Sequence, residues 1–96
     1  MYIVQTTHTF DEWLENLKDQ RVQGKIMQRV LRIESGLLGD WKTVGAGVSE
    51  LRIDYGPGYR LYYTLRDRVL VILLCGSDKK SQNSAIATAK ELAKRY

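Results

Sequence analysis

Apolar residues near the start of the chain change from the spacing of a strand to the spacing of a helix. Residues 2–7 are rich in β-branched and aromatic side chains, which predicts a strand. Thr9 and Glu12 then have the spacing of a capping box, so we expect a helix to begin directly after Thr9. Its apolar stripe recurs at i, i+3, i+4 and i+7 and consists of Phe10, Trp13, Leu14 and Leu17. We interpret Trp13 as an anchor of the core.

A second apolar stripe predicts a second helix after Asp19. It recurs every three or four residues and consists of Val22, Ile26, Val30, Ile33 and Leu37. Gly36 is placed to cap the end of this helix, because glycine readily adopts the left-handed backbone conformation found there. We expect the two helices to form an antiparallel hairpin that covers one face of a sheet.

The second half of the chain alternates between apolar and polar residues, as strands do. Residues 48–54 and 59–66 alternate on either side of a turn, Gly56-Pro57-Gly58, and residues 69–75 form an apolar run typical of a strand buried on both faces. Residues 39–47 are rich in glycine and poor in apolar side chains, so we expect a loop there. The polar residues 76–82 predict a second loop.

Residues 84–96 predict a final helix, with an inner side formed by Ile86, Ala89, Leu92, Ala93 and Tyr96. The predicted fold of residues 1–96 is therefore one α+β domain. It consists of an N-terminal strand, a helix hairpin, a three-strand antiparallel meander and a short C-terminal helix, and one face of the sheet is open.

Composition and charge limit the possible functions. Fifteen Lys and Arg against 11 Asp and Glu give a net charge of +4, a modest excess that favours polyanions such as RNA. The single Cys75 and the single His8, which we place on the first strand, cannot form a metal cluster, so we expect no metal or other cofactor. The N-terminus lacks the pattern of a signal peptide, and the apolar run 69–75 is too short to cross a bilayer. We expect a soluble, cytoplasmic protein with no membrane partner.

The Gly56-Pro57-Gly58 turn predicts the register of the strands on either side of it. A turn centred on Gly56 places Arg52 opposite Arg60 and Glu50 opposite Tyr62. Two arginines in directly opposite positions repel each other, and each guanidinium has the geometry to bind two phosphate oxygens. We expect the two arginines to stand together without a nearby countercharge, ready to bind a phosphodiester.

Other polar residues are expected near this arginine pair. Glu50 would lie close enough to take a proton from a ribose hydroxyl, and Tyr62 would offer an aromatic surface or a phenol donor. The loop after the buried strand would bring Lys79, Lys80 and Gln82 to one edge. The alternative interpretation is that these are solvent-facing residues that pair only weakly with one another. The absence of a histidine pair argues against an ordinary metal-independent ribonuclease.

Several segments resemble the HigB-like "addiction module killer protein" group of the RelE/ParE toxin superfamily. They run in order along nearly the whole chain: Phe10-Asp11-Glu12-Trp13-Leu14, residues 39–45, Val48-Ser49-Glu50-Leu51-Arg52-Ile53, Gly56-Pro57-Gly58-Tyr59-Arg60 and residues 73–82. The resemblance implies the α+β fold of that superfamily. It also implies a toxin that cleaves messenger RNA in the ribosome, where the 2′-hydroxyl attacks the adjacent phosphate and basic residues stabilise the charge.

Carried over by position, the resemblance implies catalytic roles on the sheet and in the loop that follows it. Arg60 matches the strand arginine of the superfamily, and Arg52 lies where relatives have a basic residue on the preceding strand. Lys79 and Lys80 approximate a basic residue of the loop, whereas Glu50 stands where RelE toxins have lysine. The final tyrosine of RelE toxins has no clear counterpart. Further candidates for contacts to RNA are Lys42, Tyr62 and Gln82.

Three functions remain open on these grounds. The first is a ribosome-dependent mRNA endonuclease that inhibits translation and arrests growth. The second is a ParE-like toxin that inhibits DNA gyrase without cutting RNA, and the third is an inactive member that only binds its antitoxin. For all three, the resemblance implies a cognate helix-turn-helix antitoxin as partner. We expect the free toxin to be a monomer.

Overall fold

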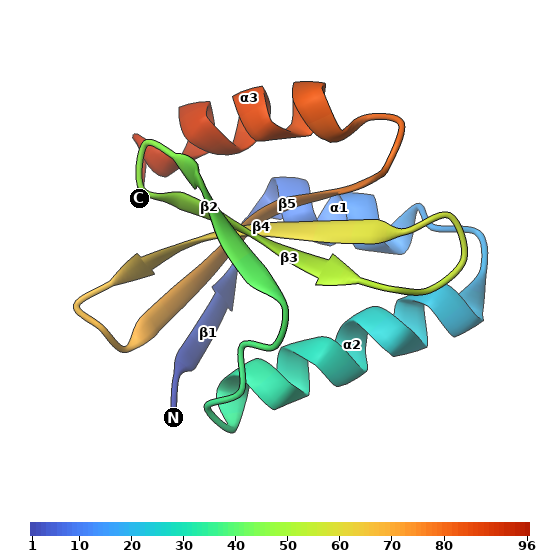
Figure 1. The fold of residues 1–96 in the computed structure, drawn as a ribbon, viewed down its shortest axis with the longest axis horizontal. Helices are drawn as coiled ribbons and strands as arrows, with labels where there is room; N and C mark the ends of the chain where they lie inside the picture. The colour runs from blue at the N-terminus through green and yellow to red at the C-terminus, as the bar shows by residue number, and fades with distance from the viewer.

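The computed structural model describes residues 1–96 and shows a five-stranded sheet with helices on both faces (Figure 1). The strands lie in the order β1-β5-β4-β3-β2, with β1 parallel to β5 and the other neighbours antiparallel. The predicted α+β fold is confirmed, although the meander has four strands rather than three. Along the chain, the elements are β1 (Ile3–Thr6), α1 (His8–Glu15), α2 (Gln20–Glu34), β2 (Trp41–Gly45), β3 (Val48–Ile53), β4 (Tyr59–Arg66), β5 (Leu70–Asp78) and α3 (Gln82–Ala93).

Helix α1 begins earlier than the capping-box pattern predicted. Its N-cap is Thr7, whose hydroxyl accepts a hydrogen bond from the backbone N–H of Phe10 at 3.0 Å and donates one to the carbonyl of Leu74 at 2.6 Å. Thr7 is buried against β5, and this long-range contact selects it over Thr9. His8 is therefore the first residue of the helix rather than part of the strand, and its imidazole lies 3.0 Å from the Glu12 carboxylate.

Helix α2 ends as its glycine predicted. Gly36 has a φ of +99°, and its N–H donates to the carbonyl of Ile33, while the N–H of Leu37 donates to the carbonyl of Arg32. These two bonds form a Schellman motif, which explains why the helix stops at Glu34. Leu37 consequently lies beyond the helix and is exposed, so its expected place in the apolar stripe was wrong.

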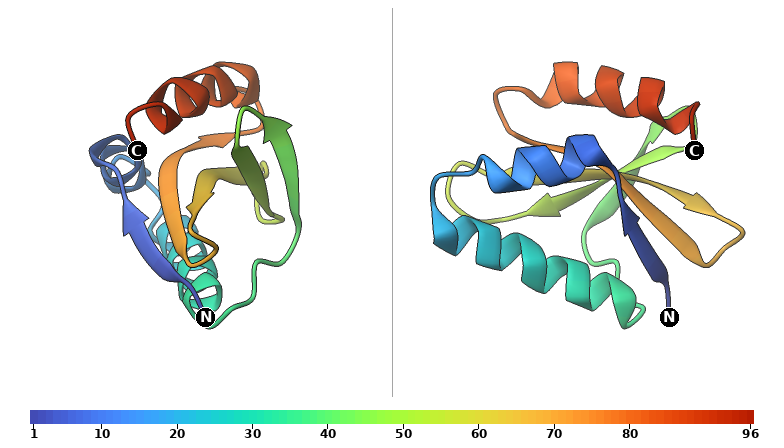
Figure 2. Two further views of the ribbon diagram at one scale, coloured as in Figure 1. Left: turned by 90° about the vertical axis from the view of Figure 1, so that its left-hand side faces the viewer. Right: turned by 180° about the vertical axis from the view of Figure 1, so that it is seen from behind.

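The core consists of two clusters, one on each face of the sheet. Figure 2 shows the helices that lie on these faces. Helices α1 and α2 cover one face, as the predicted hairpin required, and enclose residues such as Phe10, Ile26 and Leu61. Helix α3 packs on the other face through the small side chains of Ala85 and Ala89, against residues that include Tyr62. The expectation of an open sheet face was therefore wrong over the part of the sheet that α3 covers.

Strand β2 occupies the segment that was predicted to be a loop. Four of its five residues are exposed, and it pairs only with β3 at the edge of the sheet. It therefore has no apolar alternation that the sequence could display, and backbone pairing rather than burial holds it. Ala46 and Gly47 connect it to β3 with positive φ values of 55° and 75°, as a tight hairpin turn requires.

Strand β5 is buried on both faces, as its apolar run predicted, but it continues through Asp78 into the second predicted loop. Its pairing with β4 shifts by one residue, because Tyr62 lies opposite Cys75 whereas Tyr63 lies opposite Leu73. This bulge places Leu74 and Cys75 on the same face, under α3. Cys75 is a free, buried cysteine within the core cluster under α3.

Helix α3 begins at Gln82, earlier than predicted, and its last residues also differ from the expected pattern. Tyr96 was placed on the inner side, but it lies beyond the helix and is 49% exposed. The Arg66 side chain holds this end by donating hydrogen bonds to the carbonyls of Ala93 and Tyr96. No helix in the chain combines the length and the apolar character that crossing a bilayer would need.

Candidate functional site

The site is built on the hairpin formed by β3 and β4. Arg52 lies opposite Arg60 and Glu50 lies opposite Tyr62, so the predicted register is confirmed. The hairpin turns at Gly56 and Gly58, which both have positive φ values, and the N–H of Gly58 donates to the carbonyl of Tyr55. The turn residues therefore determine the register that brings the two guanidinium groups together.

A buried carboxylate lies between the basic side chains of this site. Glu50 is fully buried, and its Oε1 lies 3.6 Å from the Arg60 Nε, 3.8 Å from the Arg52 Nε and 3.9 Å from the Lys42 Nζ. The expectation that the arginines lack a countercharge was therefore wrong. One carboxylate among three cations nevertheless leaves a charge of 3 − 1 = +2.

The Glu50 carboxylate is held on its other side by the first residue of α3. Its Oε2 accepts a hydrogen bond from the Gln82 amide at 3.0 Å, whereas its Oε1 and the Nε of Arg60 are buried without a hydrogen-bond partner. Glu50 therefore links the arginine pair to α3. Because its side chain is out of solvent, it does not face the hollow in which a substrate would lie.

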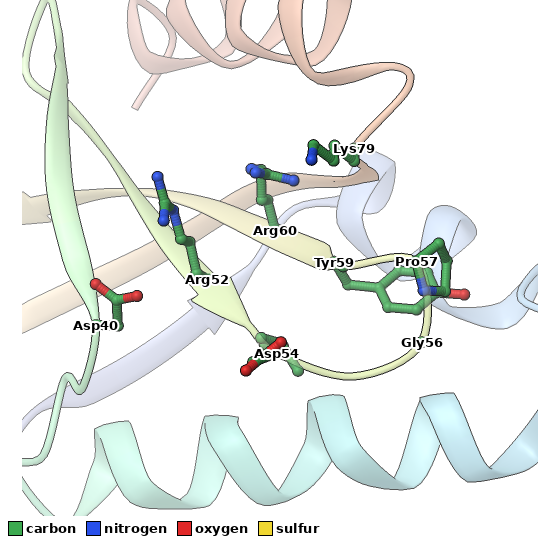
Figure 3. A pocket seen from close by; sticks show the side chains of 10 residues that line it. Asp40, Arg52, Asp54, Gly56, Pro57, Tyr59, Arg60 and Lys79 are labelled. Carbon is green, nitrogen blue, oxygen red and sulfur yellow. The ribbon is translucent and has the colours of Figure 1, made fainter.

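A hollow of about 370 Å³ opens next to the arginine pair at the ends of β3 and β4 (Figure 3). Arg52 and Arg60 project to the same side of the sheet, and Lys79 approaches Arg60 from the segment between β5 and α3. The hollow is lined by Asp40, Arg52, Ile53, Asp54, Gly56, Pro57, Gly58, Tyr59, Arg60 and Lys79. It therefore combines two guanidinium groups, an ammonium group, two carboxylates and an aromatic ring.

The structure separates the predicted loop lysines. Lys79 shares the hollow with the arginines, whereas Lys80 lines a neighbouring hollow with Pro57, Asp78 and Lys79. Lys42, on β2, has a half-exposed side chain at the far side of Glu50. Lys79 is thus brought to the arginine pair, and Lys80 is not.

Tyr62 differs most from its predicted role. Its ring is fully buried under α3, and its hydroxyl is hydrogen-bonded to the Ser77 hydroxyl at 3.1 Å. Burial raises the pKa of Tyr62 to about 12. The ring cannot offer an aromatic surface, and Tyr59, which lines the hollow, is the aromatic residue available for such a contact.

Two acids at the hollow were not proposed as site residues from the sequence. Asp40 and Asp54 are exposed and line it (Figure 3). Asp54 follows Arg52 at the spacing of one strand face, so alternation could have indicated it. Asp40 lies within the segment predicted to be a loop, and no pattern marks it. No three His, Cys, Asp or Glu side chains come together where they could hold a metal ion.

Comparison with known proteins agrees with this architecture. The family described as "Phage derived protein Gp49-like (DUF891)" matches residues 12–96. The chain belongs to this Gp49-like family. A protein of Haemophilus influenzae is 51% identical to it over 90 residues, which cover 94% of this chain and 91% of that protein.

Two solved structures share the fold of this Gp49-like protein. A chain of the intact Escherichia coli RelBE toxin–antitoxin complex matches with a TM-score of 0.65 and 18% identity, over 81% of this chain and 96% of that one. YafQ from Escherichia coli BL21(DE3) matches with a TM-score of 0.65 and 13% identity, over 85% of this chain and 98% of YafQ. The predicted resemblance to the RelE/ParE superfamily is confirmed in the fold.

Proposed function

We propose that this Gp49-like protein is the toxin of a toxin–antitoxin pair and cleaves messenger RNA at the ribosome, inhibiting translation and arresting growth. The observation that carries the proposal is the arginine pair. Arg52 and Arg60 are held side by side at an open hollow with Lys79. Asp40 and Asp54 also line this hollow, but the buried Glu50 is the one carboxylate that forms an ion pair with either arginine. Such an arrangement suits a phosphodiester, because planar guanidinium groups bind two phosphate oxygens at once.

The proposed reaction is an attack of the ribose 2′-hydroxyl on the adjacent phosphate. The oxygen–phosphorus bond formed by the 2′-oxygen closes a cyclic phosphate, and the bond to the 5′-oxygen of the next nucleotide breaks. Negative charge grows on the phosphate oxygens during this step, and Arg52 and Arg60 stabilise it from fixed positions. The protein supplies these charges from its own side chains, so we propose a metal-independent reaction.

We assign the proton transfers of this reaction from the solvent exposure of the carboxylates. Glu50 is buried and bound by Gln82, so we propose that it orients the arginines rather than acting as the general base. The exposed carboxylates in the hollow, Asp40 and Asp54, are the candidates for accepting the 2′-hydroxyl proton. We propose that Lys79, which lines the hollow with the two arginines, stabilises the leaving 5′-oxygen. Lys80 lines the neighbouring hollow instead, so we assign it no part in that step.

The proposed partners follow from the proposed activity. Messenger RNA would be positioned by the ribosome, and this places the protein in the cytoplasm. The similarity to a chain of the RelBE complex supports an antitoxin partner, which we propose to be a helix-turn-helix protein that binds the free, monomeric toxin.

The test is inducible expression of the wild type and of Arg52→Ala, Arg60→Ala and Arg68→Ala variants, followed by mapping of transcript ends. Arg52 is half exposed, so its truncation should leave the protein folded, and circular dichroism checks this for each variant. Arg68 lies in the β4–β5 turn, lines none of the hollows and serves as the matched control. Codon-phased cuts should be as abundant for Arg68→Ala as for the wild type and should fall to a low, measurable residual level for the other two variants.

Three results would exclude this function. Growth arrest by folded Arg52→Ala and Arg60→Ala proteins would show that the arginine pair is dispensable. Growth arrest with intact messages and DNA-damage signalling would instead indicate the ParE-like alternative. A wild-type protein that causes no arrest but binds the antitoxin would indicate an inactive member.

A further inference from the structure

The backbone of Arg52 lies at the point where the edge strand no longer supports β3. Pairing between β2 and β3 extends only as far as Trp41 opposite Leu51. Beyond it, the N–H of Arg52 donates to the carbonyl of Asp40 at 3.0 Å. The carbonyl of Arg52 accepts a hydrogen bond of 2.8 Å from the Nη1 of Arg29, on α2. A side chain therefore binds this last part of the strand edge, where a neighbouring strand would otherwise pair.

The same guanidinium group also holds the loop that leads into β2. The Nη2 of Arg29 donates to the carbonyl of Leu38 at 3.2 Å and to the carbonyl of Asp40 at 3.4 Å. Asp40 thus shares its carbonyl between Arg29 and the N–H of Arg52. Three backbone carbonyls from two segments converge on one planar group, a geometry that the ammonium group of lysine cannot reproduce.

Gly39 shows how closely the loop passes the guanidinium group. A Cβ atom on this residue would lie 2.6 Å from the Nη2 of Arg29, and its φ of +73° also favours glycine. Burial and the neighbouring charge of Arg32 lower the pKa of Arg29, and Asp40 partly offsets this. The loop is therefore packed around Arg29, and this burial makes the charged guanidinium less favourable than it is in water.

We propose that Arg29 is a positioning residue for RNA cleavage, which acts by holding the backbone of Arg52 in register at the hollow. The inference rests on the proposed function. Arg29 is not among the residues that line the hollow, and its Nη atoms are occupied by carbonyls, so it does not touch the substrate. Arg52 needs such support because Arg60 lies directly opposite and repels it.

The proposal predicts that the effect of Arg29 on cleavage is transmitted through Arg52. Arg29→Lys keeps the charge but loses the planar fork, and we expect cleavage of ribosome-bound message to lose about 10- to 100-fold in kcat with KM nearly unchanged, as expected of a misplaced catalytic group. In an Arg52→Ala background the same substitution should cause no further loss, because the group that it positions is absent. Arg32→Lys, one turn along α2 and exposed, is the matched control and should match the wild type.

A second measurement separates positioning from general destabilisation. Hydrogen exchange of the Arg52 amide should become faster in Arg29→Lys, while amides of the central strand β5 keep their protection. Gly39→Ala, which disturbs the same contact from the loop side, should reproduce both the faster exchange and the dependence on Arg52. If either variant unfolds, exchange and cleavage measured on the other decide the matter.

The outcomes distinguish this inference from the function on which it rests. The positioning role is overturned, while the nuclease stands, if the losses of cleavage in Arg29→Lys and Arg52→Ala multiply in the double variant. Unchanged protection of the Arg52 amide in Arg29→Lys has the same meaning. Cleavage that is unaffected by Arg52→Ala would instead overturn the nuclease site itself.

Discussion

The buried carboxylate of Glu50 offers the sharpest test of how the site is held together. Replacing Glu50 by Gln keeps the shape of the side chain and an oxygen that can accept the Gln82 hydrogen bond, but removes the negative charge. Of its three cationic neighbours, Arg60 has a side chain that is only 11% exposed, whereas Lys42 and Arg52 are about half exposed. The contact with Arg60 should therefore dominate the loss, because water screens the other two.

The expected magnitude follows from that burial. Breaking a buried ion pair from one side costs about 3–5 kcal/mol, and the retained packing favours the lower end, about 3 kcal/mol. For a domain of this size, such a loss lowers Tm by roughly 12–24 °C. The control is Glu91→Gln, whose 70% exposed side chain pairs with Lys94 at 3.0 Å and should contribute less than about 1 kcal/mol.

Thermal and urea unfolding of the two variants and the wild type provide the measurement. Unfolding in the presence of inorganic phosphate provides a second measurement. An anion that binds the uncompensated cations of folded Glu50→Gln should raise the Tm of this variant more than the Tm of the wild type. The reasoning is refuted if Glu50→Gln and Glu91→Gln differ from the wild type by the same small amount. It is equally refuted if phosphate stabilises all three proteins alike.

Three further predictions concern pH and packing. Because burial raises the pKa of Tyr62 to about 12, the neutral phenol is favoured in the folded protein, and its contribution to stability is intact below pH 10 and lost between about pH 10 and 12. Urea unfolding over this range should therefore show a shallower decline for Tyr62→Phe than for the wild type, and equal slopes would contradict the burial argument. Gly76→Ala places a Cβ atom 2.3 Å from the Trp13 ring and should destabilise by about 1–3 kcal/mol in urea unfolding. A Gly76→Ala protein as stable as the wild type would show that the Trp13 ring can move. Gly24→Ala has open space within α2 and should raise the free energy of unfolding by about 0.5–1 kcal/mol.

The sequence by itself determined the features that depend on neighbouring residues. The stripes of Val22 and Ile26 predicted α2, and Gly36 predicted its end, because helix periodicity and capping are local. The turn at Gly56 determined that Arg52 faces Arg60, because a tight hairpin allows one register for its strands.

Only the tertiary structure decided what surrounds the arginine pair. Strand β2 has too few apolar residues to be visible in the sequence, yet pairing with β3 forms it and brings Lys42 near Glu50. The packing of α3 buries Glu50 and Tyr62, and the reach of Arg29 from α2 supports Arg52. These contacts join segments that are far apart in the chain, and their existence depends on which elements stack together, so no local pattern of residues could specify them.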